Sequence, residues 1–468
     1  MIVSAGLMTG TFSLQLRGET PPASLPALAP LIHHVQIQPD GTEPNSLDFA
    51  ALKKGDRASL PIGVFDSGIG GLTVLEAILK IDAYDNETLQ PGADGKPDFA
   101  GEKFIYLGDQ ANMPYGNYPS QGREDYLREL IVKDAIFLLG RRYHGASGPA
   151  LDKPPVKGLV IACNTATAYG IDDIRAALRA LNLDIPVIGV VEAGARAVVD
   201  LLPSDGPPPT IGVLATVGTC ASNAYPKAIA RAAGLAGKPV PRVVQQGSIG
   251  LAGAIEGNPA YVWTGTSERP VPYAGPKETA LNTVAAYADF DVSRMVRQPA
   301  FAETVLGRKE AENNARGLGM LVLGCTHFPL IEKELDHALD TERKTPRSQD
   351  GGADSTSIAV ESKVAFINPA EHTAKELFRA LAKGGLRAKG GPVPPVSTFY
   401  LSVPNPAAEG VKLAQDGSLD TAYKVSRKTG RPEVEDTKVV PMTMETLPAS
   451  SRLLLEKLPT VLEQLKRN

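Results

Sequence analysis

Short apolar segments recur along most of the chain, and stretches with the spacing of amphipathic helices lie between them. Each segment has the length of a strand, and strands buried on both faces of a parallel sheet have this uniformly apolar character. Strands that alternate with helices are typical of parallel sheets covered by helices. The sequence therefore predicts an α/β protein. The expected strands are 62–65, 103–107, 156–162, 185–191, 210–215, 320–323 and 364–367.

Chain length and composition set the number of domains. A chain of 468 residues with 43% hydrophobic residues is long enough for two domains, each with its own core. Residues 1–60 show no clear period, and we interpret them as an N-terminal extension of uncertain order. Near the C-terminus, residues 447–465 carry a helical apolar face that Pro459 interrupts, and we expect this segment to pack on the first domain.

The charge and cysteine content narrow the choice of partner and compartment. The net charge is −4, so no strongly basic surface indicates nucleic acid or an anionic membrane, and a small-molecule partner fits better. No uncharged apolar stretch reaches the roughly 18 residues of a transmembrane helix. The three cysteines form a poor disulfide framework, and no Lys or Arg precedes Arg17 as in a secretory signal. We therefore expect a cytoplasmic protein.

Two cysteines, Cys163 and Cys325, each follow an expected strand and precede an expected helix. Backbone N–H groups and the helix dipole at such a position stabilise a thiolate, which predicts lowered thiol pKa values. A single cysteine in this setting is more often a small core residue. Because the setting occurs twice, and polar residues follow both times, we favour chemistry between two thiols. The third cysteine, Cys220, lacks such a motif and is expected to pack in the core.

Other polar residues also stand where strands end. Asp66 precedes a glycine-rich turn that could receive a carboxylate. Asp66 itself could act on a substrate ammonium or adjust a nearby thiol, but it could equally be only a cap for the next helix. Tyr115 and Gly116 could line a polar pocket or form an ordinary turn. His327 could adjust the protonation of Cys325. Zinc is a rival for a Cys and His set, yet dispersed cysteines without a Cys-x-x-Cys pair make a closed structural site a poor fit. Further candidates are Thr216, Thr219, Glu192 and Glu256.

Taken in order, these segments resemble the glutamate racemase family, within the cofactor-independent aspartate and glutamate racemases. The resemblance rests on residues 65–71, 108–109 with 114–116, 162–168, 188–192, 216–219 and 323–327. It covers most of 61–385. The first sixty residues, the stretch 258–318 and much of the last eighty have no counterpart in it.

The resemblance implies two α/β domains with the active site between them and no cofactor. The first domain would comprise 61–187 plus 361–468 and the second 188–360. It further implies an isomerase that interconverts L- and D-glutamate and supplies D-glutamate for peptidoglycan synthesis, and it allows a homodimer. The alternatives are a racemase of aspartate or a related amino acid on the same scaffold, and a binding or regulatory homologue without activity.

The implied mechanism moves protons between two thiols. One thiolate removes the α-proton while the opposite thiol protonates the other face of Cα. By resemblance, Cys163 works on the D-enantiomer and Cys325 on the L-enantiomer, with Asp66 and His327 assisting. The residues expected to hold the substrate are Ser67, Tyr115, Gly116, Asn164, Thr165, Thr216, Thr219 and Thr326.

Overall fold

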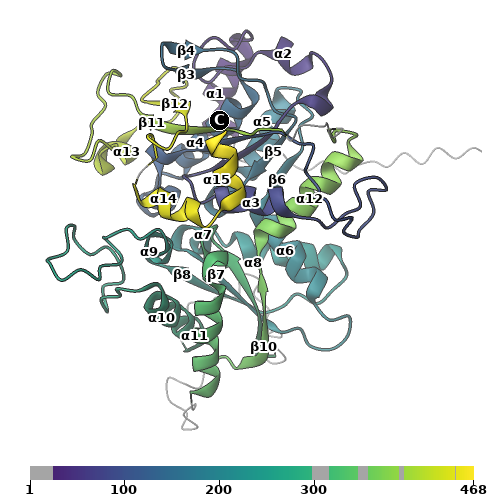
Figure 1. Ribbon diagram of the computed structural model, residues 1–468, viewed down its shortest axis with the longest axis vertical. Helices are drawn as coiled ribbons and strands as arrows, with labels where there is room; N and C mark the ends of the chain where they lie inside the picture. The colour runs from purple at the N-terminus through teal and green to yellow at the C-terminus, as the bar shows by residue number, and fades with distance from the viewer. Residues whose placement is uncertain (1–24, 298–315, 346–356, 389–394, 448, 468) are drawn as a thin grey trace, which may run out of the picture.

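The computed structural model describes residues 25–297, 316–345, 357–388, 395–447 and 449–467. In this part of the chain, two mainly parallel sheets lie one above the other, each covered by helices on both faces (Figure 1). A small hairpin of β3 (Tyr143–Gly145) and β4 (Gly148–Ala150) stands apart from both sheets. The α/β prediction is therefore confirmed.

The first sheet has six strands in the order β12-β11-β2-β1-β5-β6. All neighbouring strands are parallel except β12, which runs antiparallel to β11 at the edge. The central strands are buried along their whole length, as expected for apolar strands covered on both faces. The strands are β1 (Ile62–Asp66), β2 (Phe104–Gly108), β5 (Gly158–Ile161), β6 (Val187–Gly189), β11 (Thr398–Pro404) and β12 (Thr437–Pro441).

Two groups of helices bury the faces of this sheet. One face packs against α1 (Leu25–Ile37), α4 (Glu124–Leu139) and α5 (Asn164–Ala180). The other face packs against α3 (Leu72–Lys80), α12 (Pro369–Lys383), α14 (Ala449–Glu456) and α15 (Pro459–Lys466). Residues from distant parts of the sequence thus share one core.

The second sheet has four parallel strands in the order β10-β9-β7-β8. They are β7 (Thr210–Thr216), β8 (Val243–Ser248), β9 (Leu318–Gly324) and β10 (Val360–Ile367). One face packs against α9 (Leu251–Ile255), α10 (Val284–Arg297) and α11 (Glu332–Lys344), and the other against α6 (Val190–Leu201) and α8 (Ala224–Leu235). The remaining α-helices, all short, are α2 (Phe49–Lys53), α7 (Val217–Ala221) and α13 (Thr421–Ser426).

The strand pairing differs slightly from the predicted domain limits. β6 extends past residue 187 while remaining in the first sheet, and β10 belongs to the second sheet although most of it lies beyond residue 360. The helix α12 follows β10 and returns to the first sheet, where it also contacts α6. The C-terminal prediction is confirmed, since Pro459 begins α15 and Leu454, Leu455 and Val461 are buried in the core around β1 and α3.

The described part of the N-terminal extension, residues 25–60, is built into the first sheet's core, so the expectation of uncertain order was wrong for it. Leu28, Leu31 and Val35 have no exposed surface and pack with residues of α4 and α5. Their spacing is that of one helical face. The period is short, and Pro30 within the helix obscured it. Residues 1–24 lie outside the described part.

Truncating this helix face is expected to destabilise the whole first sheet. Leu31→Ala should lower the free energy of unfolding by about 2–5 kcal/mol, because it leaves a cavity in a packed core. Ile37→Ala is the matched control, since Ile37 is 57% exposed on the same helix and should change stability little. Denaturant unfolding measures both. Equal stabilities for the two variants would mean that α1 does not belong to the core.

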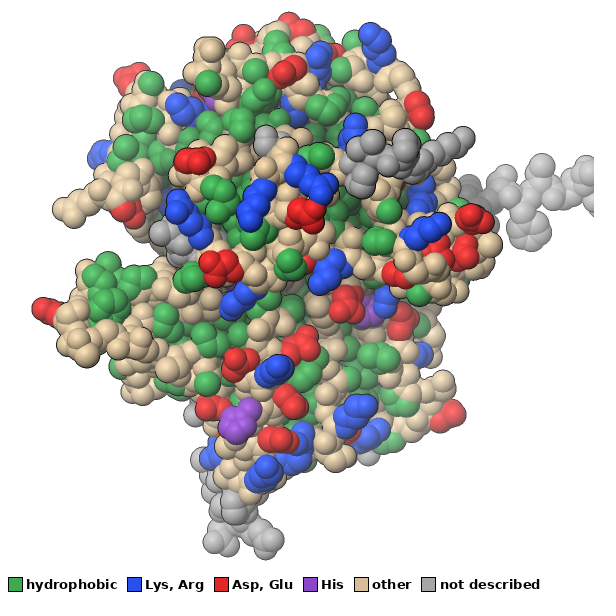
Figure 2. All heavy atoms as spheres, in the orientation of Figure 1, with side chains coloured by type: hydrophobic (Ala, Val, Ile, Leu, Met, Phe, Trp, Pro, Cys, Tyr) green, Lys and Arg blue, Asp and Glu red, His purple; other side chains and the backbone are tan. Residues whose placement is uncertain are grey.

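The surface charges match the composition. On the face shown in Figure 2, Lys and Arg side chains are interspersed with Asp and Glu over both halves of the molecule. No helix in the described ranges has the length and apolar character needed to cross a membrane.

Candidate active site

Cys163 lies where β5 ends and α5 begins, as the sequence predicts. Its Sγ caps the helix by accepting the Ala166 N–H at 3.3 Å, and the thiol donates to Ser67 Oγ at 3.6 Å. Ser67 belongs to the turn after the neighbouring strand β1. Cys163 is only 6% exposed. Cys163 therefore stands in a nearly dry site with one hydroxyl beside it.

The expected lowering of the thiol pKa does not occur at Cys163. Burial raises the pKa of this thiol, and the nearby Asp66 raises it further, while the N–H groups of Ala166 and Ser67 only partly oppose them. Burial disfavours an anion more than the helix N-terminus favours it here. Without substrate, Cys163 is a neutral thiol and therefore a proton donor.

Asp66 ends β1, and its carboxyl accepts hydrogen bonds from the turn that follows. Its Oδ2 accepts the N–H groups of Gly68 and Gly71 at 3.3 and 2.9 Å, which orders the turn before α3. Burial raises the pKa of the Asp66 carboxyl, although Gly71 N–H, His327 and Cys163 act in the opposite direction. The carboxyl is thus both a structural acceptor and a neighbour of Cys163 and His327.

Cys325 follows β9, and His327 stands next to it. Cys325 Sγ lies 3.7 Å from His327 Nδ1, and His327 Nε2 lies 2.9 Å from Glu256 Oε1. Cys325 and His327 are 7% and 8% exposed. Burial alone would lower the pKa of His327, but its contacts with Cys325 and Glu256 outweigh burial and raise it. The imidazole is therefore placed to exchange a proton with Cys325 while Glu256 holds its far side.

Removing the Glu256 charge is expected to lower the pKa of His327. In Glu256→Gln the ring keeps a neighbour of the same size but loses the carboxylate that favours the imidazolium. NMR titration of the histidine rings measures the change. Glu278→Gln is the control, because Glu278 is largely exposed and pairs with Arg294. An unchanged His327 titration in Glu256→Gln would contradict this account of the contact.

The turn between β1 and α3, whose Ser67 lies beside Cys163, contacts the loop of Cys325 although the two belong to different sheets. Thr73 Oγ1, at the start of α3, donates to the carbonyl of Thr326 at 2.7 Å. A Cβ on Gly70 would lie 2.6 Å from Thr326 Oγ1 and still closer to the His327 ring. The turn that carries Asp66 and Ser67 therefore lies directly against the loop of Cys325.

A group of hydroxyls forms a second contact between the sheets. Thr165 Oγ1, beside Cys163, lies 3.1 Å from Thr219 Oγ1 and 3.5 Å from Thr216 Oγ1. Thr216 caps α7 and accepts the Thr219 N–H at 3.3 Å. All three residues were expected to hold substrate, and the structure brings them together.

Tyr225 is a residue of this region that the motifs did not indicate. Its hydroxyl donates to Asn164 Oδ1 at 2.7 Å, so it fixes the amide beside Cys163. Its ring also lies 3.1 Å from the position of a Cβ on Gly324, the residue before Cys325. Tyr225 belongs to α8, where it reads as one more apolar core position. Only the folded chain places it next to both cysteine loops.

The hydroxyl of Tyr115, which was expected to line a polar pocket, already has buried partners. The Tyr115 hydroxyl lies between two buried carboxyls, 2.5 Å from Asp109 Oδ2 and 2.7 Å from Asp134 Oδ2. The predicted pocket at this tyrosine is a buried polar network instead. Gly116 does reach the second contact, since its Cα lies 2.8 Å from where a Cβ on Gly218 would be.

Glu192 and Cys220 make contacts that hold the fold together. Glu192 lies in the first turn of α6 and pairs with Arg175 at 3.2 Å, and Cys220 packs against the core of the second sheet. Among the described residues, no group of three or more His, Cys, Asp and Glu side chains is placed to hold a metal ion.

Comparison of the sequence with known proteins shows the family of this chain. A family model described as Asp/Glu/Hydantoin racemase matches residues 144–263. A glutamate racemase from Pediococcus pentosaceus is 30% identical over 338 residues, which cover 71% of this chain and 85% of the relative. The chain belongs to the glutamate racemase family. It is therefore an isomerase, an amino-acid racemase.

Other racemases are also similar to this family member. A glutamate racemase from Lysinibacillus sphaericus is 27% identical and covers 77% of this chain and 96% of its own length. Among solved structures, glutamate racemase isoform RacE1 from Bacillus anthracis is 26% identical with a TM-score of 0.43, covering 73% of this chain and 87% of its own. Glutamate racemase from Francisella tularensis in complex with D-glutamate is 22% identical with a TM-score of 0.46, and covers 80% and 95%.

Proposed function

We propose that this racemase interconverts L- and D-glutamate by proton transfer between Cys163 and Cys325. One observation carries the proposal. Each thiol follows a parallel strand, the two strands belong to different sheets, and the turn that carries Ser67 beside Cys163 contacts the loop of Cys325. Two acid–base groups of the same kind on opposite sides of one site suit a reaction whose substrate and product are mirror images.

The reaction balances without a redox partner. A thiolate on one side takes the α-hydrogen as a proton, so an S–H bond forms as the Cα–H bond breaks and the electron pair stays on carbon. The opposite thiol gives its proton to the other face of Cα. The protonation states of the two thiols are then exchanged, and the reverse reaction or exchange with water restores them.

The surroundings of the thiols support distinct starting roles. The neutral, buried Cys163 is set to donate, and His327 is set to take a proton from Cys325. Cys325 would then act first as the base, on the L-enantiomer, and Cys163 would act as the base on the D-enantiomer. Asp66 would assist Cys163. Fixed donors in a water-poor site stabilise the carbanion that forms at Cα.

The substrate would be held by groups at both contacts between the sheets. Its carboxylates and ammonium would contact short polar side chains and backbone N–H groups. These groups have few rotatable bonds, so they lose little conformational freedom when they bind. The residues proposed for this role are Ser67, Gly116, Asn164, Thr165, Thr216, Thr219 and Thr326.

The choice of glutamate rests on the relatives, which are named glutamate racemases. D-Glutamate made by this reaction would serve peptidoglycan synthesis in the cytoplasm. A homodimer remains part of the proposal, on the same family resemblance.

Isotope exchange tests the proposal directly. Each enantiomer of glutamate and aspartate is incubated with the protein in heavy water, and deuterium at Cα and optical rotation are followed. Deuterium gain with loss of optical activity for glutamate is the expected result. Exchange with aspartate alone would move the activity to that substrate, and exchange with neither would defeat the proposal.

A further inference from the structure

The stretch of residues 405–436, between β11 and β12, forms a C-terminal insertion that lies against the segment after β2. This insertion lies within the last eighty residues, much of which has no counterpart in the family resemblance. Lys424 Nζ donates to the Met113 carbonyl at 2.7 Å, and the Gly430 N–H donates to Glu129 Oε2 at 2.6 Å. The insertion is therefore attached to the loop after β2 and to α4, and one buried side chain makes further contacts with the same loop.

That side chain is Arg427, which is only 7% exposed. Its guanidinium donates to Asn112 Oδ1 at 2.6 Å, to the Tyr118 hydroxyl at 2.9 Å and to Asp436 Oδ2 at 3.1 Å. It also lies over the ring of Tyr126, 4.8 Å from the centroid. Asn112 and Tyr118 flank one loop, residues 112–118, so a single rigid group fixes both ends of it.

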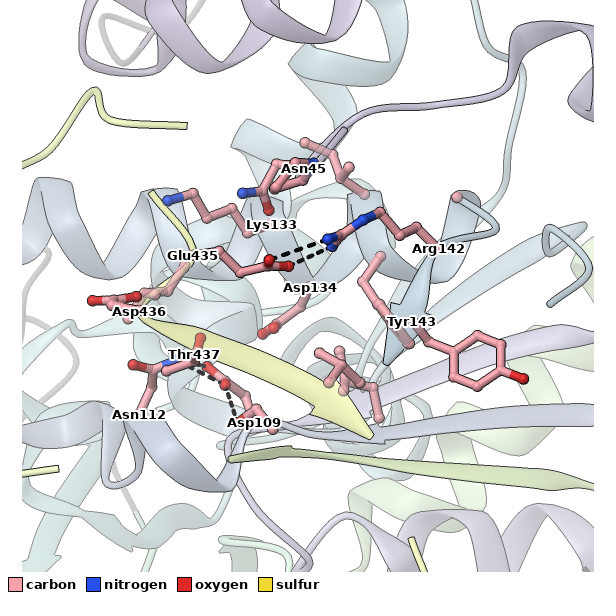
Figure 3. Close-up of a pocket in the computed structure, with 18 of the residues that line it drawn as sticks. Asn45, Asp109, Asn112, Lys133, Asp134, Arg142, Tyr143, Glu435, Asp436 and Thr437 are labelled. Atoms are coloured by element: carbon pink, nitrogen blue, oxygen red, sulfur yellow. Dashed lines mark hydrogen bonds and ion pairs between the residues drawn. The ribbon is translucent and has the colours of Figure 1, made fainter. Parts of the chain in front are cut away.

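Asn112 connects Arg427 to a buried group of polar side chains around Asp109. The Asn112 amide donates to both oxygens of Asp109, at 2.8 and 2.9 Å, as the dashed lines in Figure 3 show. Asp109 also accepts from Tyr115 and from Ser402 of β11. Since each buried polar group has its partners in this network, the position of Tyr115 follows from the position of Asn112.

Beyond Tyr115, the loop reaches the candidate active site. Gly116 lies against Gly218 so closely that no side chain fits between them. Gly218 and Thr219 both belong to α7, and Thr216 is the N-cap of this helix. The hydroxyls of Thr216 and Thr219 contact the hydroxyl of Thr165, which lies beside Cys163. The contacts thus run without a break from Arg427 to the hydroxyls proposed to hold substrate.

We infer that Arg427 is a positioning residue for the racemase reaction: it holds loop 112–118 so that Gly116 supports α7 and its threonines in register with Cys163. The inference rests on the proposed function for its kinetic consequence. Arg427 itself does not touch the thiols or the substrate. The insertion between β11 and β12 would therefore help to set the geometry of the site.

Arg427→Lys tests the inference while keeping the positive charge near Asp436. A lysine cannot reach Asn112, Tyr118 and Asp436 together, so the loop loosens. We expect kcat/KM for both enantiomers to fall about tenfold, chiefly through KM, because positions of substrate-holding groups change and the thiols do not. Arg431→Lys is the matched control, since the Arg431 side chain is 56% exposed in the same insertion and pairs with Glu433.

A second variant separates positioning from folding. Tyr118→Phe removes one acceptor of Arg427 and the hydrogen bond that the same hydroxyl donates to the Asn112 carbonyl, but it leaves the other Arg427 contacts in place, so it should lower kcat/KM less than Arg427→Lys. Because both changes act on one network, the double variant should lose less than the product of the single effects. Multiplying effects would overturn the inference, as would a parental kcat/KM in Arg427→Lys or a loss that only follows the fraction of unfolded protein.

Hydrogen exchange gives a readout that does not depend on the substrate. In Arg427→Lys, the backbone amides of 112–118 and of α7 should exchange faster than in the parent, and those of β7 should not. Unchanged exchange in both segments would overturn the inference even in an active enzyme. A parent protein that leaves glutamate unchanged would defeat the proposed function, while faster exchange in the variant would still uphold the role of Arg427.

Discussion

Replacing either Cys163 or Cys325 by serine is expected to lower the rate of glutamate racemisation by at least about 10³-fold, because a serine hydroxyl is far too weak an acid to take the place of a thiol in proton transfer. Both side chains are small and buried, so the substitution changes little volume. Circular dichroism of the substrate measures the rate, and thermal unfolding should show a fold close to that of the parent.

The two serine variants should differ from each other in exchange. Cys163→Ser retains Cys325 and should still wash deuterium slowly into L-glutamate, while Cys325→Ser should do so into D-glutamate. Cys220→Ser is the control, since Cys220 packs against the second sheet's core and should leave racemisation unchanged. Parental racemisation by Cys163→Ser or Cys325→Ser would rule out the two-thiol mechanism.

Gly70→Ala is expected to be the most damaging change outside the thiols. Its methyl group would collide with Thr326 Oγ1 and the His327 ring, so the loop of Asp66 and the loop of Cys325 must move apart. A displacement of about 1 Å between catalytic groups costs on the order of 10²-fold in rate. Steady-state kinetics should therefore show a fall of that size in kcat/KM.

Gly234→Ala provides the comparison for Gly70→Ala. Gly234 lies in α8, where an added Cβ meets no described neighbour within 4 Å, so activity should be unchanged. Thermal unfolding should show that Gly70→Ala remains folded, because the clash involves side chains at the surface between the two sheets rather than a core. Parental kinetics in Gly70→Ala would mean that the two loops do not need this close approach.

Local pattern was enough for the central strands and the two cysteine positions. Buried parallel strands are apolar along their length, and β1, β2, β5, β7 and β9 have that character. Other elements lacked such a signal. The N-terminal helix α1 was missed because its period is short and contains a proline, and β11 and β12 because they lie within a stretch rich in turn residues.

Within the candidate site, the sequence predicted residue types better than their surroundings. The helix start at Cys163 suggested a lowered thiol pKa, yet the pKa is raised, because desolvation depends on every element packed around the sulfur. Nothing in the sequence indicated that the Tyr115 hydroxyl donates to Asp134 of α4. Glu256 stood among several acidic candidates, and only its 2.9 Å contact with His327 distinguishes it from Glu192.

The sequence by itself therefore determined the α/β class, the two thiols at strand ends and the family. It could do so because strand burial and the residues that follow each strand are local properties of the chain. The tertiary structure alone decided which polar groups meet: Glu256 with His327, Tyr225 with Asn164, and Arg427 with a loop more than 300 residues earlier. Such contacts depend on how two sheets and their insertions pack together, and no local pattern of residues encodes that packing.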